Sequence, residues 1–341
     1  MAAPTAIQPV AISMGDAAGI GPEIIAKAFQ AEPALLQGCF VVGDVGLMRR
    51  ALALLTGVVP ALAPIATPRD TWQVPPRCIP VLQPGADTPA MPYGIVSAAA
   101  GRLAADCVAW GARAALRGEV AALVTAPVHK EALAAAGVPY PGHTELLQAE
   151  AAAHAGRPVA EMPVRMMLAN PELRTVLVSI HLALRTALDA VTFDNVLQTL
   201  RITHAALATI LGRAPRIGVA GLNPHAGEGG LFGREEIETI APAMAAARTE
   251  GIDAQGPYAP DTVFMRARTG AFDVVVAMYH DQGLIPVKYL GVEQGVNVTL
   301  GLPLVRTSPD HGTAFDIAGT GRADARSLVE ALRMARQLAI A

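Results

Sequence analysis

The chain has 341 residues, of which 52% are hydrophobic, and its formal net charge at pH 7 is −3. That length is enough for one large or two medium domains with well-formed cores. The acidic balance argues against a nucleic-acid partner, which would require a basic face, and no apolar run is long enough to span a bilayer, so we expect no membrane partner.

The opening residues and the cysteines indicate the compartment. The first segment lacks the basic start of a signal peptide. Cys39, Cys78 and Cys107 are odd in number and have no metal-ligand spacing. We therefore expect a cytoplasmic protein with reduced thiols.

The first half of the chain alternates predicted strands and helices. Pro22 suits the first turn of a helix that follows the first strand. Strands are expected at 6–15, 39–44, 78–82 and 120–127, and helices after Pro22, at 45–55 and at about 96–117.

The second half continues the alternation. Strands are expected at 164–169, 174–181, 216–225 and 273–280, and helices at about 193–211 and from about 235. This rhythm predicts an α/β fold with mainly parallel sheets and helices on both faces. We expect two lobes, the first formed by 1–135 with roughly 300–341 and the second by 136–299.

Three of the predicted strands end in a histidine, at His181, His225 and His280. In open α/β sheets the carboxyl ends of the strands face the ligand crevice. Three imidazoles at that edge would suit a divalent ion with positions left open for substrate; alternatively, each is bonded to nearby backbone. Asp281 could orient His280 or accept a proton, or it could cap a turn or helix.

Glycine-rich segments and isolated cations suggest anion sites. The segment 14–24, MGDAAGIGPEI, follows a strand and opens a helix, where phosphates bind, but it matches neither the dinucleotide-binding nor the Walker pattern. Lys288 and Arg306, with Asn297 between them, could hold a substrate phosphate, or the cations could be solvated surface charges. The segment 308–321, rich in Gly, Thr and Asp, could hold a ribose hydroxyl or could be only a loop.

Several motifs, in this order, resemble the 4-hydroxythreonine-4-phosphate dehydrogenase (PdxA) family of pyridoxal-phosphate biosynthesis. They are MGDAAGIGPEI, VTAPVHK, YPGHTELL, HLALR, GLNPHAGEGG, MYHDQG, GVNVTLGLP and RTSPDHGTAFDIAGTGRAD. The family is related to the isocitrate and isopropylmalate dehydrogenases. The resemblance implies a two-lobed α/β/α subunit with its active site in the interlobe cleft, at the interface of a homodimer. The first lobe would carry the cofactor loop, and the second the metal histidines and the dimer contacts.

The resemblance also implies roles for individual residues. His181, His225 and His280 would hold one divalent metal ion (zinc, magnesium or cobalt), with the ligand set completed by the partner subunit. The expected substrate contacts are His143, Thr144, Lys288, Asn297 and Arg306. The expected contacts to NAD or NADP are His311, Gly312, Thr313 and Asp316. The candidate catalytic residues are Asp281, Asp261 and Lys130.

The expected reaction is oxidation of a phosphorylated secondary alcohol. In the family, 4-phosphohydroxy-L-threonine transfers a hydride to NAD(P)⁺, and the resulting 3-oxo acid loses CO₂ to give 3-amino-2-oxopropyl phosphate. Two motifs also resemble paralogues that oxidise 4-phospho-D-threonate or 4-phospho-D-erythronate. Outside this class, the histidines could serve a metal-dependent hydrolase or aldolase, or the chain could be a non-catalytic sugar-phosphate binder.

Overall fold

The computed structural model describes residues 8–340 and divides them into two compact units. Unit 1 contains the residues up to Pro163 together with Leu302–Ile340, and unit 2 is Val164–Gly301. Both are α/β, as expected. The strand expected at 6–15 begins outside the described residues. Within residues 8–340, no helix has the length and apolar character needed to cross a membrane.

The strands of unit 1 follow one another in parallel, in the order β3-β4-β2-β1-β5-β12. The strands are β1 (Val10–Ser13), β2 (Cys39–Val42), β3 (Ala61–Pro64), β4 (Cys78–Leu82), β5 (Ala122–Thr125) and β12 (Arg306–Pro309). The helices are α1 (Gly21–Ala31), α2 (Val45–Leu52), α3 (Ala98–Leu116), α4 (Lys130–Ala135), α5 (His143–Ala155) and α11 (Arg326–Ile340), with short 3₁₀ turns η1 (Pro68–Gln73) and η2 (Val159–Glu161).

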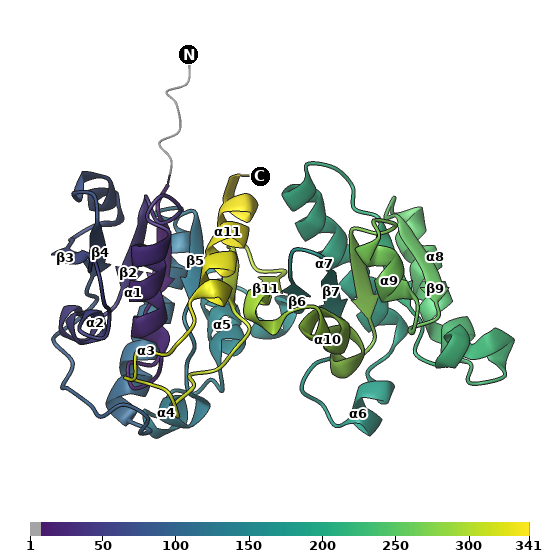
Figure 1. Ribbon diagram of the computed structural model, residues 1–341. Helices are drawn as coiled ribbons and strands as arrows, with labels where there is room; N and C mark the ends of the chain where they lie inside the picture. Colours follow the sequence, from purple (N-terminus) through teal and green to yellow (C-terminus); the bar gives the residue numbers. More distant parts are fainter. Residues whose placement is uncertain (1–7, 341) are drawn as a thin grey trace, which may run out of the picture. The chain divides into compact units, whose positions relative to one another are not determined.

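Helices cover both faces of this sheet. On one face α11 packs on β5 and β12 and also contacts α1. Figure 1 shows the yellow α11 beside the purple α1, so the last helix returns to the first unit, and Arg333 pairs with Glu32 across them. On the other face α3 packs on β1, β2 and β5. Gly101 lets α3 approach α4, because a Cβ there would lie 2.0 Å from the Ala132 carbonyl oxygen.

Residues 136–163 belong to unit 1, so the structure divides the chain later than the approximate boundary expected at 135/136. Their helix α5 packs on α3, and Glu150 of α5 pairs with Arg113 of α3 at 2.7 Å. These contacts attach α5 to the helix of unit 1 that precedes it. The chain returns from unit 2 to unit 1 between Gly301 and Leu302, close to the return expected near residue 300.

The strands of unit 2 follow the order β11-β6-β7-β10-β8-β9. They are β6 (Arg165–Ala169), β7 (Arg174–Leu177), β8 (Ile217–Ala220), β9 (Ala254–Tyr258), β10 (Val274–Ala277) and β11 (Val296–Leu300). The helices are α6 (Leu184–Asp189), α7 (Phe193–Leu211), α8 (Ala241–Thr249), α9 (Val263–Arg268) and α10 (His280–Tyr289), with the short turns η3 (Pro224–Gly230), η4 (Glu236–Ile240) and η5 (Val292–Gln294).

This second set of strands is mixed rather than mainly parallel. β6 runs antiparallel to both β7 and β11, whereas β7, β10, β8 and β9 are parallel. The cause is a tight turn between β6 and β7, in which the Asn170 side chain accepts hydrogen bonds from the N–H groups of Glu172 and Leu173. So short a connection can only join antiparallel neighbours.

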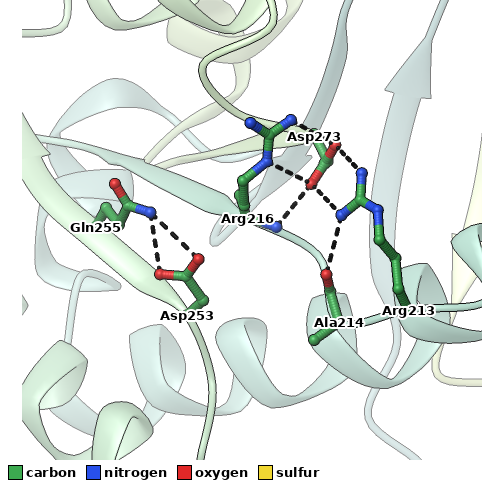
Figure 2. A network of polar contacts seen from close by, with 6 residues as sticks. All are labelled: Arg213, Ala214, Arg216, Asp253, Gln255 and Asp273. Atoms are coloured by element: carbon green, nitrogen blue, oxygen red, sulfur yellow. Dashed lines mark hydrogen bonds and ion pairs between the residues drawn. The ribbon is translucent and has the colours of Figure 1, made fainter.

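The central strands of unit 2 are fastened at their amino ends by an ionic network (Figure 2). Asp273, just before β10, accepts hydrogen bonds from the guanidinium groups of Arg213 and Arg216. It also accepts from the backbone N–H of Arg216, which precedes β8. These contacts fix the register of β10 against β8 at the edge opposite to the one where the histidines emerge.

Candidate active site

The three strand-end histidines follow neighbouring parallel strands of unit 2. β10 lies between β7 and β8, so the carboxyl ends of all three strands meet at one edge. His181 follows β7, His280 follows β10 and His225 follows β8. The imidazole rings of His181 and His280 lie 5.5 Å apart between centroids.

Carboxylates orient two of these imidazoles. His280 Nδ1 lies 2.7 Å from Asp281 Oδ1, and His225 Nδ1 lies 3.0 Å from Glu228 Oε2. In each case Nε2 is the nitrogen left to bind a ligand. Pairing of one ring nitrogen with a carboxylate is the usual way in which metal-binding histidines are oriented.

His225 lies in an unusual backbone segment. Residues 225–229 all have positive φ, between 43° and 80°. His181 also has a positive φ of 51°. Such values are uncommon outside glycine and cluster at functional sites. The surrounding fold holds both histidines in this conformation.

The types of side chain at these strand ends suit a divalent ion. Residues 8–340 contain no ready-made group of three His, Cys, Asp or Glu side chains that could hold one. The rings of His181 and His280 are nevertheless close enough to share an ion, given metal–nitrogen bonds of about 2 Å. Neutral imidazoles with carboxylate partners are the donors that zinc and related ions prefer.

Two cavities of unit 2 adjoin these histidines. The smaller, of about 360 Å³, is lined by His181, His280 and Asp281. The larger, of about 750 Å³, is lined by His225, Asp261 and Asp281, among others. Two of the three candidate catalytic residues therefore lie on cavity walls beside the histidines, and Asp281 contributes to both cavities.

The remaining predicted residues of unit 2 lie on other elements. Lys288 is exposed in the last turn of α10, and Asn297 lies on β11 opposite Leu168 of β6. In unit 1, the third catalytic candidate, Lys130, is exposed at the start of α4.

In unit 1, Arg306 is buried and its charge acts on the half-buried His143. The Arg306 guanidinium donates to Thr125 Oγ1 from Nη2 at 2.7 Å and from Nε at 3.2 Å. Burial lowers the pKa of Arg306 to about 10. Burial and the nearby positive charge of Arg306 hold the pKa of His143 well below its usual value, against the opposing hydrogen bond to the Ala126 backbone.

His143 is therefore neutral at physiological pH. Its Nε2 atom is buried and has no hydrogen-bond partner among the residues that the structure describes, which is costly unless a ligand supplies one. His143 and the neighbouring Thr144 occupy the first turn of α5, directly after Gly142.

The expected cofactor residues share one loop, which packs on the glycine-rich segment after β1. The backbone N–H of Ile20 donates to the Thr313 carbonyl oxygen at 3.0 Å, and a Cβ on Gly19 would lie 2.8 Å from that oxygen. His311 Nδ1 lies 3.0 Å from the carbonyl oxygen of Gly312. Gly312 and Asp316 are exposed, and the space around Gly312 is open.

Two further polar residues beside this loop were not expected from the sequence. Asp16 Oδ2 and His129 Nδ1 are buried without a hydrogen-bond partner within residues 8–340. The His129 ring stacks on Phe315 of the cofactor loop at 4.5 Å, and burial raises the pKa of Asp16. In the sequence, Asp16 lies in a glycine-rich turn. Its place between glycines was the one signal that could have identified it as a candidate site residue.

Comparison with known proteins identifies the family. Residues 36–335 match the family described as "Pyridoxal phosphate biosynthetic protein PdxA". A 4-hydroxythreonine-4-phosphate dehydrogenase from Beijerinckia indica is 52% identical over 97% of this chain and 95% of its own. A D-threonate 4-phosphate dehydrogenase from Pectobacterium atrosepticum is 47% identical over 97% and 99% of the two chains.

A solved structure agrees with these matches. The crystal structure of 4-hydroxythreonine-4-phosphate dehydrogenase from Klebsiella pneumoniae has a TM-score of 0.87 and 41% identity, with 99% of both chains covered. The resemblance found in the sequence motifs is thereby confirmed. The chain belongs to the PdxA family of dehydrogenases.

Proposed function

We propose that this protein is a cytoplasmic, homodimeric NAD(P)-dependent and divalent-metal-dependent enzyme. It oxidises 4-phosphohydroxy-L-threonine to a 3-oxo acid, which decarboxylates to 3-amino-2-oxopropyl phosphate in pyridoxal-phosphate biosynthesis. The observation that carries the proposal is the delivery of three histidines by neighbouring strands of unit 2, two of them already oriented by carboxylates. The relatives named as 4-hydroxythreonine-4-phosphate dehydrogenases supply the substrate.

In unit 2, the histidines would bind the ion, and an acidic side chain would accept the proton of the substrate hydroxyl. A zinc, magnesium or cobalt ion held by His181, His225 and His280 would acidify the substrate hydroxyl and stabilise the negative charge left by decarboxylation. Asp281 keeps the His280 ring oriented through Nδ1. Asp261, on the wall of the larger cavity, is the proposed acceptor of the hydroxyl proton, and Lys130 is the alternative.

The ligand set is completed across the dimer. No single chain gathers three donors within residues 8–340, so we propose that the partner subunit supplies the missing imidazole. Met265, Ile285 and Tyr289, which are exposed apolar side chains on the wall of the larger cavity, support such an interface.

In unit 1, buried polar groups recognise the substrate. Burial of the Arg306 guanidinium disfavours its charged form, which is why its pKa is lowered. A phosphate dianion would stabilise that charge through a bidentate contact. Lys288 and Asn297 are the other proposed substrate contacts. Neutral His143 can accept a hydrogen bond from the substrate through Nε2, and the Thr144 hydroxyl lies next to it.

The loop 311–316 is the proposed site for NAD or NADP. Gly312 leaves open space for close approach of a ligand, and exposed Asp316 could accept from ribose hydroxyls. His311 and Thr313 flank that opening. The packing of this loop on the helix-opening glycine segment also places it near the amino end of α1, where a pyrophosphate is favoured.

A second substrate must be tested beside the first. Relatives named D-threonate 4-phosphate dehydrogenases are nearly as similar, at 47% and 46% identity. 4-Phospho-D-threonate and 4-phospho-D-erythronate replace the amine by a hydroxyl and keep the phosphate, so Arg306 would serve them equally.

The decisive experiment is NADH formation by metal-loaded protein with the three phosphorylated substrates. A kcat/KM at least tenfold higher for 4-phosphohydroxy-L-threonine, equivalent to about 1.4 kcal/mol in the transition state, would support the biosynthetic role. Preference for a hydroxy acid would assign a sugar-acid role to the same site. Ligand binding without turnover would indicate a non-catalytic sugar-phosphate binder. Metal-dependent turnover without nicotinamide would indicate a hydrolase or aldolase.

A further inference from the structure

One residue at the end of β10 is held on both sides by side chains from the histidine-bearing segments. The N–H of Met278 donates to Gln282 Oε1 at 2.7 Å, and its carbonyl oxygen accepts from Ser179 Oγ at 3.1 Å. Gln282 then uses Nε2 to donate to the carbonyl oxygen of Gly221 at 2.8 Å. Ser179 follows β7 and Gly221 follows β8. We call Ser179, Met278, Gln282 and Gly221 the strand-end bridge.

The strand-end bridge begins where the backbone ladder between these strands stops. The last backbone bond from the β7 segment to β10 runs from Val178 N–H to the Ala277 carbonyl oxygen. Beyond it, the side chains of Ser179 and Gln282 connect the three strand ends. Ser179 is buried and Gln282 half-buried, so water competes weakly for these bonds.

Three residues of the bridge, Ser179, Met278 and Gly221, lie a few residues before a histidine. His181 comes two residues after Ser179, His280 two after Met278 and His225 four after Gly221. The last of these intervals is fixed as well, because Glu236 accepts hydrogen bonds from the N–H groups of Leu222 and Asn223, both at 2.7 Å. A change in the spacing of the strand ends would therefore move the imidazoles.

We propose that Gln282 is a positioning residue for metal binding: its contacts with Met278 and Gly221 set the spacing of the segments that carry His280 and His225, and Ser179 joins the His181 segment to the same Met278. Gln282 does not ligate the ion, because its Oε1 accepts from the Met278 N–H and its Nε2 donates to the Gly221 carbonyl oxygen. This inference rests on the proposed histidine metal site and adds the residue that holds it in register. A glutamine is required because the contact needs one acceptor and one donor on the same planar group.

The test is Co²⁺ binding to the metal-free, full-length protein, followed by calorimetry and by the visible absorption of bound cobalt. The variants are Gln282→Leu, which removes both bonds, Gln282→Glu, which keeps the acceptor for Met278 but loses the donor to Gly221, and Ser179→Ala. The matched control is Gln255→Leu, another half-buried glutamine of unit 2, whose amide donates to Asp253 on β9's side of the sheet (Figure 2). His225→Ala tests the metal site itself.

We expect the Gln282 variants to bind Co²⁺ about tenfold more weakly or worse, as is common when a supporting contact of a metal ligand is lost, with an altered cobalt spectrum. Ser179→Ala should weaken binding less, and Gln255→Leu should match wild type. Wild-type affinity and spectrum in both Gln282 variants, even with a lowered melting temperature, would overturn the positioning role while leaving the metal site intact. Equal Co²⁺ binding by wild type and His225→Ala would overturn the histidine site, and this inference with it.

Discussion

At the scale of single residues, His143 combines burial with a missing hydrogen-bond partner. Its pKa is depressed by burial and by the charge of Arg306. In the unfolded chain the same imidazole titrates near its ordinary value of about 6.5. Between the two pKa values the unfolded state binds a proton that the folded state does not, so the stability contributed by neutral His143 is lost as the pH falls below about 6.5.

The corresponding variant is His143→Asn. We expect wild type to lose more stability than the variant when the pH is lowered from 7.5 to 5.5, since asparagine does not titrate. Thermal unfolding of both proteins at the two pH values measures this. Parallel pH profiles would contradict a depressed pKa for His143.

Arg306 allows a prediction about the substrate phosphate. Arg306→Ala should raise KM for a phosphorylated substrate by roughly ten- to a hundredfold, because a hydrogen bond to a charged group contributes about 1.5–3 kcal/mol. Arg306→Lys should recover only part of the affinity, since lysine lacks the planar fork. Arg333→Ala, which removes a surface ion pair of α11, is the control in initial-rate measurements. An unchanged KM would remove Arg306 from the phosphate site.

At the scale of elements, the loop after β8 depends on one buried carboxylate. Glu236 is 3% exposed and accepts hydrogen bonds from the N–H groups of Leu222 and Asn223. A side chain on Gly227 would lie 2.7 Å from Glu236 Oε2, so a glycine is needed where the loop folds over it. The left-handed segment that carries His225 is built around this contact.

Glu236→Ala should therefore lower the free energy of unfolding by at least about 2 kcal/mol, because two buried N–H groups lose their acceptor. Glu238→Ala, two residues along the chain, removes an exposed pair with Arg234 and should change the free energy of unfolding by less than about 1 kcal/mol. Urea unfolding of both variants measures the difference. Equal losses would show that the loop does not need the Glu236 carboxylate.

The ionic network at the amino ends of β8 and β10 (Figure 2) should make the free energy of unfolding depend on pH in the acid range. Hydrogen bonds from Arg213 and Arg216 hold the pKa of Asp273 well below its usual range. A depressed carboxyl pKa stabilises the fold above the unfolded value of about 4, and this contribution is lost as the pH falls below it. Asp273→Asn should be less stable than wild type at pH 7, and the gap should close below about pH 4. Denaturant unfolding across this range would reveal a constant gap if the pKa were normal.

Much of the element pattern could be predicted from the sequence. The helix Phe193–Leu211 has the expected bounds because Thr192 caps its start through a bond from the Asn195 N–H and Gly212 ends it in a left-handed conformation. β9 and β12 were missed, since their sequences AQGPY and RTSP are polar or contain Gly and Pro and are formed by pairing with neighbours rather than by propensity.

The site was only partly predictable for a related reason. Each histidine could be placed after a strand from the apolar run before it, as in Val274–Ala277, but the strands end three to five residues earlier than expected, at Leu177, Ala220 and Ala277. That β10 lies between β7 and β8 depends on long-range pairing, which no local pattern encodes. The strand-end bridge exists only in that strand order. Gln282 therefore looked like a turn residue beside His280 and Asp281.

At the scale of the whole molecule, the lobe boundary depended on tertiary packing. The sequence offered no linker, and the tight spacing of elements between 120 and 165 gave no signal for separation. Only the packing of α5 on α3 and the ion pair of Arg113 with Glu150 assign 136–163 to unit 1. As a result, the substrate candidates His143 and Thr144 belong to the same unit as Arg306 and the cofactor loop.

The wall of the larger cavity leads to a prediction about assembly. Met265, Ile285 and Tyr289 line it with His225 and are 57%, 63% and 89% exposed. Large apolar side chains gathered beside a polar site mark an interaction surface. We therefore expect a second copy of the chain to cover this wall, as the proposed shared metal site requires.

Ile285→Glu should then give a folded monomer, because a charge at the centre of an apolar contact cannot be buried unpaired, and it should lose Co²⁺ binding together with NADH formation. Val58→Glu, at a side chain 68% exposed in unit 1, should remain dimeric and active. Light scattering coupled to size-exclusion chromatography gives the mass, and circular dichroism checks the fold. A dimeric Ile285→Glu variant would place the interface elsewhere, whereas a monomer with full metal affinity would show that one chain can supply every ligand.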